Sequence, residues 1–185
     1  MALYRSRRRD AVYRAVTRLL AFALASVAVA VTPGRARHTA CQWALGLRFP
    51  AENLAGLTPA TRAAFEAARA EALWRHGELL GLTSGHRDFR TQAALFAAAV
   101  ERAGSEEAAR RRVLPPHESR HVAGLALDVR PMEGALWLEV YGATYGLYRR
   151  YDNEWWHFEY CANGRPARLA HPDDVREVHQ SVSVA

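Results

Sequence analysis

Apolar side chains recur every three or four positions between residues 58 and 77, which is the spacing of one helix face. The residues on this face are Phe65, Ala68, Ala72 and Leu73. Thr58 can cap the start of the helix with its hydroxyl, and Pro59 suits the first helical position because its missing N–H has no partner there anyway. The pattern predicts a helix that ends near Gly77.

Capping residues also precede the next two predicted helices. Asp88 precedes a segment with a clear apolar face, and Ser105 precedes a shorter helix that reaches Arg112. The apolar positions of the first segment are Leu95, Phe96, Ala99, Val100 and Ala103. A further helix is predicted over residues 136–143.

Short apolar segments between these helices predict strands at residues 78–83, 124–129, 147–151 and 155–160. Helices and strands alternate without the regular spacing of βαβ units. This order favours an α+β fold, in which one small domain has a central, mostly antiparallel sheet and flanking helices. A chain of 185 residues is long enough for one such domain with its own core.

The first 30 residues have a different pattern. Arginines between Arg5 and Arg18 precede 13 uncharged residues, Leu19 to Val31, and Ala28-Val29-Ala30 is a candidate cleavage site. Thirteen residues are too few for a helix across a hydrocarbon core of ~30 Å, which needs ~20. We expect residues 1–30 to be a cleaved signal peptide or, alternatively, a retained membrane anchor, and the protein to be secreted or held in the cell envelope.

The rest of the chain is divided by composition. Residues 31–42 contain Pro33, Gly34 and mixed polar residues, and we expect residues 31–56 to be a linker and entry segment that leads into the domain. The domain is expected over residues 57–162 and a peripheral tail over residues 163–185. Cys41 and Cys161 bracket the domain, so in an exported protein they predict one disulfide, with two unrelated thiols as the alternative.

The formal net charge of +6 is concentrated at the N-terminus, where residues 1–30 hold six arginines and one acidic residue. Residues 31–185 hold 19 arginines and 18 acidic residues, and they lack the basic stripe that phosphate binding requires. Nucleic-acid binding is therefore not expected.

Three segments carry candidate chemistry. The first is SGHRDFRTQ, residues 84–92, at a predicted strand-to-helix junction. The guanidinium of Arg87 could hold a carboxylate or a developing oxyanion through paired hydrogen bonds. Taken alone, the segment is explained better by a solvated arginine near a helix cap.

The second segment, residues 115–128, places His121 on a loop after a proline pair and Asp128 at the end of the following strand. Gly124 between them permits a turn or a close backbone approach. The third segment, EWWHFEY at residues 154–160, places Glu154 and His157 beside two indoles. An aromatic core strand explains its rings but not a glutamate and a histidine in the same apolar run.

His121, Asp128 and His157 together supply three ligands, which is the number that a catalytic zinc ion takes from protein when one position stays open for water. Two separated cysteines cannot build a thiolate-rich structural site. The His-Glu-x-x-His motif of many metallopeptidases is absent from the sequence, so zinc chemistry needs a different scaffold.

The three motifs together resemble the VanY-type D-alanyl-D-alanine carboxypeptidases, within the zinc peptidases that include the D-Ala-D-Ala dipeptidases and lysostaphin-like enzymes. The motifs are SGHR with Gln92, then SxHxxGxAxD at residues 119–128, then EWWH at residues 154–157. The resemblance covers residues 57 to 161. His86 stands where the family usually has tyrosine, and Trp155 stands where many members have proline, a spelling shared with the dipeptidases.

By position, the resemblance implies that His121, Asp128 and His157 bind zinc and that Glu154 is the catalytic acid and base. Arg87 would bind the substrate carboxylate or stabilise the oxyanion. Ser119, Gln92 and Trp156 would line the substrate site.

The implied activity is hydrolysis of the terminal D-Ala-D-Ala bond of peptidoglycan stem peptides by a monomeric enzyme. Two other activities are consistent with the motifs, namely a peptidoglycan L/D-endopeptidase and a D-Ala-D-Ala dipeptidase. A catalytically inactive, zinc-containing wall-binding module is a further alternative from another functional class.

Overall fold

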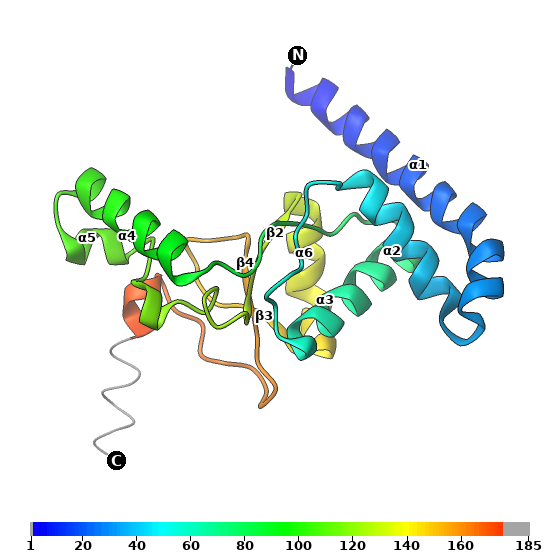
Figure 1. Cartoon of the computed structure of the whole chain (residues 1–185). Coiled ribbons are helices and arrows are strands. Elements are labelled where there is room, and N and C mark those ends of the chain that lie inside the picture. Colours follow the sequence, from blue (N-terminus) through cyan, green and yellow to red (C-terminus); the bar gives the residue numbers. More distant parts are fainter. Residues whose placement is uncertain (1, 176–185) are drawn as a thin grey trace.

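An antiparallel sheet lies at the centre of the fold in the computed structural model, which describes residues 2–175, with side chains from residue 10 onward (Figure 1). The strands are β1 (Gly81–Ser84), β2 (Ala126–Arg130), β3 (Leu147–Arg149) and β4 (His157–Tyr160). Over this part of the chain they form one sheet in the order β1-β2-β4-β3, and every neighbouring pair is antiparallel. The predicted α+β fold with a small antiparallel sheet is confirmed.

The register between β2 and β4 separates core residues from polar ones. Leu127 lies opposite Phe158, and Asp128 lies opposite His157. Successive side chains of a strand point to opposite faces of the sheet. Leu127 and Phe158 therefore share the core face, whereas Asp128, His157 and Glu159 share the other face.

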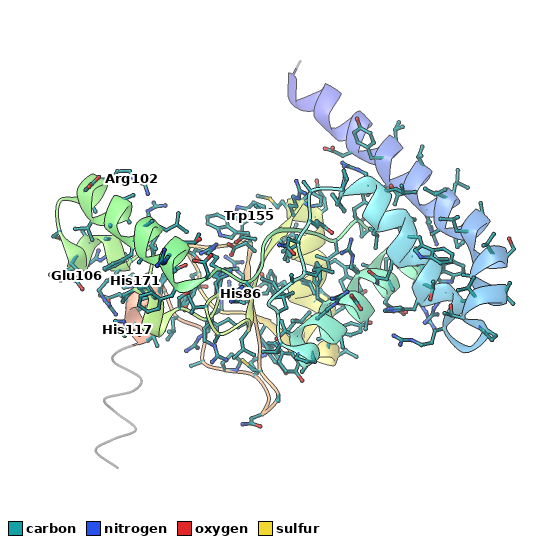
Figure 2. All side chains as sticks on the ribbon, viewed as in Figure 1. His86, Arg102, Glu106, His117, Trp155 and His171 are labelled. Atoms are coloured by element: carbon teal, nitrogen blue, oxygen red, sulfur yellow. The ribbon has the colours of Figure 1, made fainter. Side chains whose placement is uncertain are left out.

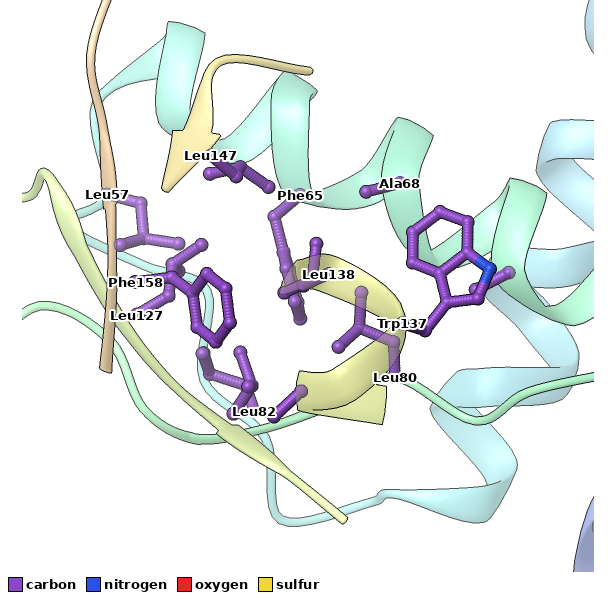
Figure 3. Packing of buried hydrophobic residues seen from close by; sticks show 13 residues of the cluster. Leu57, Phe65, Ala68, Leu80, Leu82, Leu127, Trp137, Leu138, Leu147 and Phe158 are labelled. Carbon is purple, nitrogen blue, oxygen red and sulfur yellow. The ribbon is translucent and has the colours of Figure 1, made fainter. Parts of the chain in front are cut away.

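Helices α3 (Pro59–Glu71) and α6 (Met132–Tyr141) supply apolar side chains to the core face of the sheet (Figure 3). The principal members of this core are Leu57, Phe65, Leu80, Leu82, Leu127, Val129, Trp137, Leu138, Leu147 and Phe158. Short helical turns complete the chain at η1 (Pro33–Arg35), η2 (Ala72–His76), η3 (Pro116–Glu118), η4 (Gly142–Tyr145) and η5 (Pro172–Asp174). The core thus draws on all four strands or the residues beside them, and it holds the polar face in place.

All three predicted helix caps are present. The side chains of Thr58, Asp88 and Ser105 each accept a hydrogen bond from the backbone N–H three residues later, at 3.2, 2.7 and 3.1 Å. They begin α3, α4 (Phe89–Ala103) and α5 (Glu106–Arg110). The first predicted helix also ends as expected, at Gly77 with a φ of +67°.

The predicted apolar face of α4 is covered only in part. Ala99 is buried, but Leu95 is 40% exposed. Figure 2 shows Arg102 of α4 and Glu106 of α5 at the end of the molecule far from α1 (Ala2–Val31). Arg110 of α5 is buried and binds Glu118 and Asp173, which fixes η3 and η5 beneath the helices.

The expected linker contains a helix, α2 (Ala36–Arg48), which packs against α1. Its apolar face at Cys41, Ala44 and Leu45 is fully buried. These side chains form a second cluster of buried residues with Ala21, Phe49, Ala70, Leu73 and Leu79. The prediction of a linker is therefore wrong for residues 36–48, because the helical spacing of that face outweighs the proline and glycine before it.

Residues Asp10–Val31 of α1 form a 22-residue segment that contains an 18-residue window with a mean hydropathy of 1.7, which is long and apolar enough to cross a membrane. It exceeds the 13 uncharged residues of the sequence pattern because it includes the turns between Asp10 and Arg18. A signal sequence near the N-terminus has the same properties. The choice between leader and anchor stays a prediction.

The predicted disulfide is not formed, since both cysteines are free thiols. Cys41 is buried in the second cluster, with its Sγ 3.6 Å from the carbonyl oxygen of Ala70. Cys161 follows β4, and its backbone N–H donates to the carbonyl of Gly146 at 2.9 Å. Sequence spacing places both residues at the limits of the domain but gives no information on their separation in space.

Candidate metal centre

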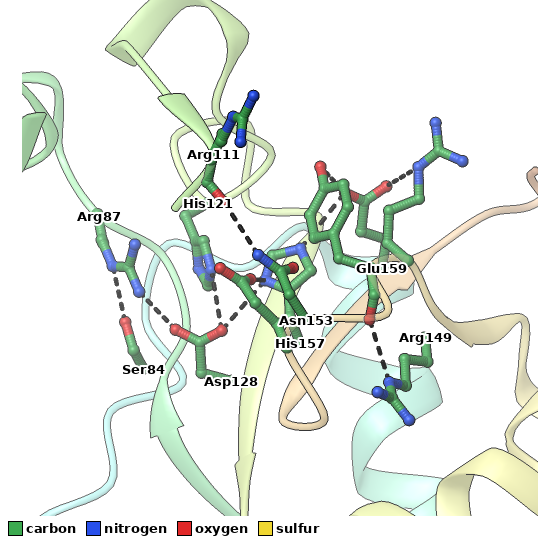
Figure 4. A network of polar contacts seen from close by, with 12 residues as sticks. Ser84, Arg87, Arg111, His121, Asp128, Arg149, Asn153, His157 and Glu159 are labelled. Carbon is green, nitrogen blue, oxygen red and sulfur yellow. Dashed lines mark hydrogen bonds and ion pairs between the residues drawn. The ribbon is translucent and has the colours of Figure 1, made fainter. Parts of the chain in front are cut away.

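His121, Asp128 and His157 come together on the polar face of the sheet (Figure 4). Each is buried, and one potential ligand atom from each lies within 4.8 Å of the others. Asp128 and His157 are neighbours because their strands pair at these positions. His121 belongs to the turn before β2, so the structure brings together the three ligands predicted from the sequence.

Gly124 allows the turn that carries His121 to approach the start of α3. Its φ is +69°, and an added Cβ would lie 2.4 Å from the carbonyl oxygen of Gly56. The carbonyl of Gly124 also accepts a hydrogen bond from the N–H of Thr58 at 3.0 Å. The close backbone approach predicted for this glycine is confirmed.

The hydrogen-bond partners of His121 identify its free nitrogen. Nδ1 lies 2.7 Å from the carbonyl oxygen of Gly85, which can only accept a hydrogen bond. Nδ1 therefore carries the proton, and the Nε2 lone pair faces Asp128 Oδ1 at 3.3 Å.

His157 has the opposite arrangement. Its Nδ1 lies 3.1 Å from Asp128 Oδ1, and its Nε2 lies 3.4 Å from Glu159 Oε1. In the neutral form of the ring, which metal binding requires, a proton on Nε2 satisfies the Glu159 carboxylate and leaves the Nδ1 lone pair beside Asp128. Two nitrogens and one carboxylate oxygen thus converge, and this donor set fits a divalent zinc ion.

The charges of the cluster act against the effect of burial. Burial alone would raise the pKa of Asp128, but the neighbouring imidazoles of His121 and His157 hold that pKa well below its usual range. Burial would lower the pKa of His157, yet the carboxylates of Asp128 and Glu159 raise it to about 10. His121 faces one carboxylate and a backbone carbonyl, so burial dominates and its pKa is lowered.

Glu154 lies beside the cluster, with its Oε2 3.8 Å from His157 Nδ1. Burial and the nearby Asp128 together raise the pKa of this carboxyl to about 7, against the opposing charges of His157 and Arg87. A carboxyl with such a pKa can exchange a proton near neutral pH.

Arg87 is held at the edge of the cluster by three side chains. Its Nη2 donates to Asp128 Oδ2 at 2.5 Å, its Nε donates to Ser84 Oγ at 2.9 Å, and its Nη1 donates to Gln92 Oε1 at 3.3 Å. Gln92 is buried and donates its own N–H to the carbonyl of Leu114 at 2.7 Å. Gln92 thereby positions Arg87.

One cavity of about 250 Å³ is lined by all eight residues that the sequence assigned to the site. These residues are Arg87, Gln92, Ser119, His121, Asp128, Glu154, Trp156 and His157. His86 is exposed outside this cavity, with its ring against Gly56. The departure from the family pattern at His86 therefore leaves the lining of the cavity unchanged.

Tyr151 and Glu159 also line the cavity, and neither was predicted from the sequence. The signal for Glu159 was its place two residues after His157 in a strand, because such residues share a face. Tyr151 follows β3, and nothing in its local pattern distinguished it from a core aromatic.

The model of the VanY D-alanyl-D-alanine carboxypeptidase family matches residues 55–163, more than half of the chain. The chain belongs to the VanY family. The match begins before α3 and ends after β4, so it contains the sheet and every ligand of the cluster. No curated protein matches the chain.

Solved structures similar to this VanY-family chain include the LdcB LD-carboxypeptidase, with 27% identity, a TM-score of 0.48, and coverage of 69% of this chain and 72% of that one. The D,D-pentapeptidase VanY from the VanB-type resistance cassette, in complex with Zn(II), has 26% identity and a TM-score of 0.45. The match covers 56% of this chain and 69% of that one. The L,D-carboxypeptidase DacB from Streptococcus pneumoniae has 26% identity, a TM-score of 0.47 and coverage of 69% and 73%.

Proposed function

We propose that the chain is a zinc-dependent D,D-carboxypeptidase that hydrolyses the terminal D-Ala-D-Ala bond of peptidoglycan stem peptides. The observation that carries this proposal is the convergence on one cavity of a buried His-Asp-His cluster, the carboxyl of Glu154 and the guanidinium of Arg87. Membership of the VanY family gives the reaction class.

His121, Asp128 and His157 would hold the zinc ion. The ion would supply a Lewis acid that polarises the scissile carbonyl and increases the acidity of water. The backbone carbonyl behind His121 and the carboxylate behind His157 orient the two rings, so both lone pairs face Asp128.

Glu154 would act as the general base and then as the general acid. As a carboxylate it accepts a proton from the attacking water, and it returns this proton to the nitrogen of the departing D-alanine. Its pKa of about 7 suits both steps, because neither transfer is then strongly uphill near neutral pH.

Arg87 would bind the terminal carboxylate of the peptide or stabilise the oxyanion. Its planar guanidinium presents several donors in a fixed geometry, which suits a carboxylate. Gln92 would act by orienting Arg87. Ser119 and Trp156 line the same cavity, and we propose that they contact the peptide.

The substrate places this activity outside the cytoplasm, in agreement with α1 as a signal peptide or a membrane anchor. We propose a monomer that acts on the stem peptide, with residues 57–162 as the catalytic domain. Helix α2 would connect this domain to α1, which is the leader or the anchor.

Mass spectrometry of a stem pentapeptide ending in D-Ala-D-Ala, incubated with the zinc-loaded full-length chain, tests the proposal. Loss of one terminal alanine that is abolished by a chelator would support a D,D-carboxypeptidase. Release of the dipeptide D-Ala-D-Ala or cleavage at an internal bond would contradict it in favour of a dipeptidase or an endopeptidase. An intact peptide with zinc bound would point to a wall-binding module.

A further inference from the structure

Glu159 is a buried carboxylate directly behind His157, and the proposed mechanism gives it no step. Its side chain is on the same face of β4 as His157, two residues further along the strand. Glu159 Oε1 lies 3.4 Å from His157 Nε2, on the side of the ring opposite the nitrogen that faces Asp128. The imidazole is therefore held between two carboxylates.

Three further side chains surround Glu159. The hydroxyl of Tyr151 donates to its Oε1 at 3.3 Å, and the Nε atoms of Arg120 and Arg150 lie 3.6 and 3.7 Å from its Oε2. A buried carboxylate is costly unless charged or hydrogen-bonding partners surround it. The two arginines stabilise the ionised form of Glu159 and leave Oε1 directed at the ring.

We propose that Glu159 is a positioning residue of the metal centre: it fixes His157 in the form with its proton on Nε2 and its Nδ1 lone pair directed at the metal. A neutral imidazole has one protonated nitrogen, and an ionised carboxylate can only accept a hydrogen bond. The partner of one ring nitrogen thus decides which nitrogen binds the metal. This inference rests on the metal site of the proposed function.

The two histidines are consequently fixed by different means. His121 has a backbone carbonyl behind Nδ1, which no side-chain substitution removes. His157 depends on the side chain of Glu159. Substitution of Glu159 therefore acts selectively on one of the two nitrogen ligands.

Zinc affinity of the full-length chain, measured by competition with a chromophoric chelator, tests the proposal without any peptide substrate. Glu159→Gln keeps the size of the side chain but offers an amide that can donate as well as accept. We expect the zinc dissociation constant to rise by roughly 10- to 100-fold, which is typical for loss of an outer-shell partner. Glu159→Asp keeps the charge and should recover part of the affinity.

Glu139→Gln is the matched control. Glu139 is also a carboxylate held by two arginines, Arg149 and Arg168, but it lies on α6 away from the cavity. The zinc affinity of the Glu139→Gln variant should equal that of the unmodified chain. A zinc affinity of Glu159→Gln within twofold of this control would overturn the proposal.

The ¹⁵N chemical shifts of the His157 ring in the unmodified, zinc-loaded chain give a second test that needs no variant to fold. We expect zinc on Nδ1 and a proton on Nε2, and the reverse arrangement in His121. Zinc on Nε2 of His157 would refute the role of Glu159. A chain that binds no zinc at all would instead refute the metal site of the proposed function.

Discussion

The two faces of the β2–β4 pair are built from alternate residues of the same strands. One face packs into the apolar core, and the other carries the candidate metal centre. On the core face, Leu127 and Phe158 are fully buried among apolar side chains. On the polar face, Asp128, His157 and Glu159 are almost equally buried, but every one has hydrogen-bonding or charged partners. A shift of one residue along the strand changes a core position into a ligand position.

Burial alone does not distinguish residues that stabilise the fold from residues that serve a function. Burying apolar area favours folding, whereas burying a charge opposes it unless partners compensate. The polar face collects such charges in one cavity, and they are arranged around a point where a cation would stabilise them. The apolar contacts on the core face stabilise the sheet and so hold these charged groups close together.

Glu154→Gln should produce the largest change, and only in activity. Loss of the proposed base should reduce kcat by roughly 100- to 10,000-fold, because the amide cannot take the proton of the attacking water. Zinc affinity and the unfolding midpoint should stay near those of the unmodified chain. Steady-state kinetics with a stem pentapeptide measures the effect, and near-normal turnover would rule out Glu154 as the base.

Phe158→Ala should produce the opposite result on the other face. Removal of a fully buried ring from the core should lower the free energy of unfolding by about 3–5 kcal/mol. Urea denaturation with zinc absent measures this change. A loss below about 1 kcal/mol would show that the core face tolerates a cavity and would weaken the contrast between the faces.

Arg87→Ala should have a smaller effect on catalysis than Glu154→Gln. Loss of one donor to a developing oxyanion typically costs about 100- to 1000-fold in kcat. If Arg87 binds only the terminal carboxylate, the loss should appear in KM instead. The separation of kcat from KM therefore assigns its role, and a variant with both constants unchanged would exclude it from the site.

Much of this architecture follows from the sequence because it is encoded locally. The caps Thr58, Asp88 and Ser105 precede their helices directly, and a cap needs only a side chain and the next turn of backbone. The candidate metal ligands are predictable for a different reason. They stand in motifs whose spacing and order match a family, although they come from a turn and two strands.

The missed features depend on contacts between distant segments. Pro33 and Gly34 indicate a linker, but the helical spacing of Cys41, Ala44 and Leu45 just after them forms the buried face of α2. The expected disulfide was wrong because the positions of Cys41 and Cys161 in the sequence do not give their separation in space. Glu159 stands two residues after His157 in the sequence, but its proposed role also depends on Tyr151, Arg120 and Arg150, which come from other segments.

Zinc binding by Asp128→Asn is the most direct test of the proposed metal centre, because Asp128 Oδ1 is the atom that faces both histidines. The substitution keeps the shape of the side chain but removes its charge. Glu154→Gln, which should stay folded and keep its zinc affinity, is the control. We expect Asp128→Asn to lose more zinc affinity than the roughly 10- to 100-fold typical for loss of an outer-shell partner. An Asp128→Asn chain that binds zinc as tightly as the unmodified protein would contradict the assignment of this face as the metal centre.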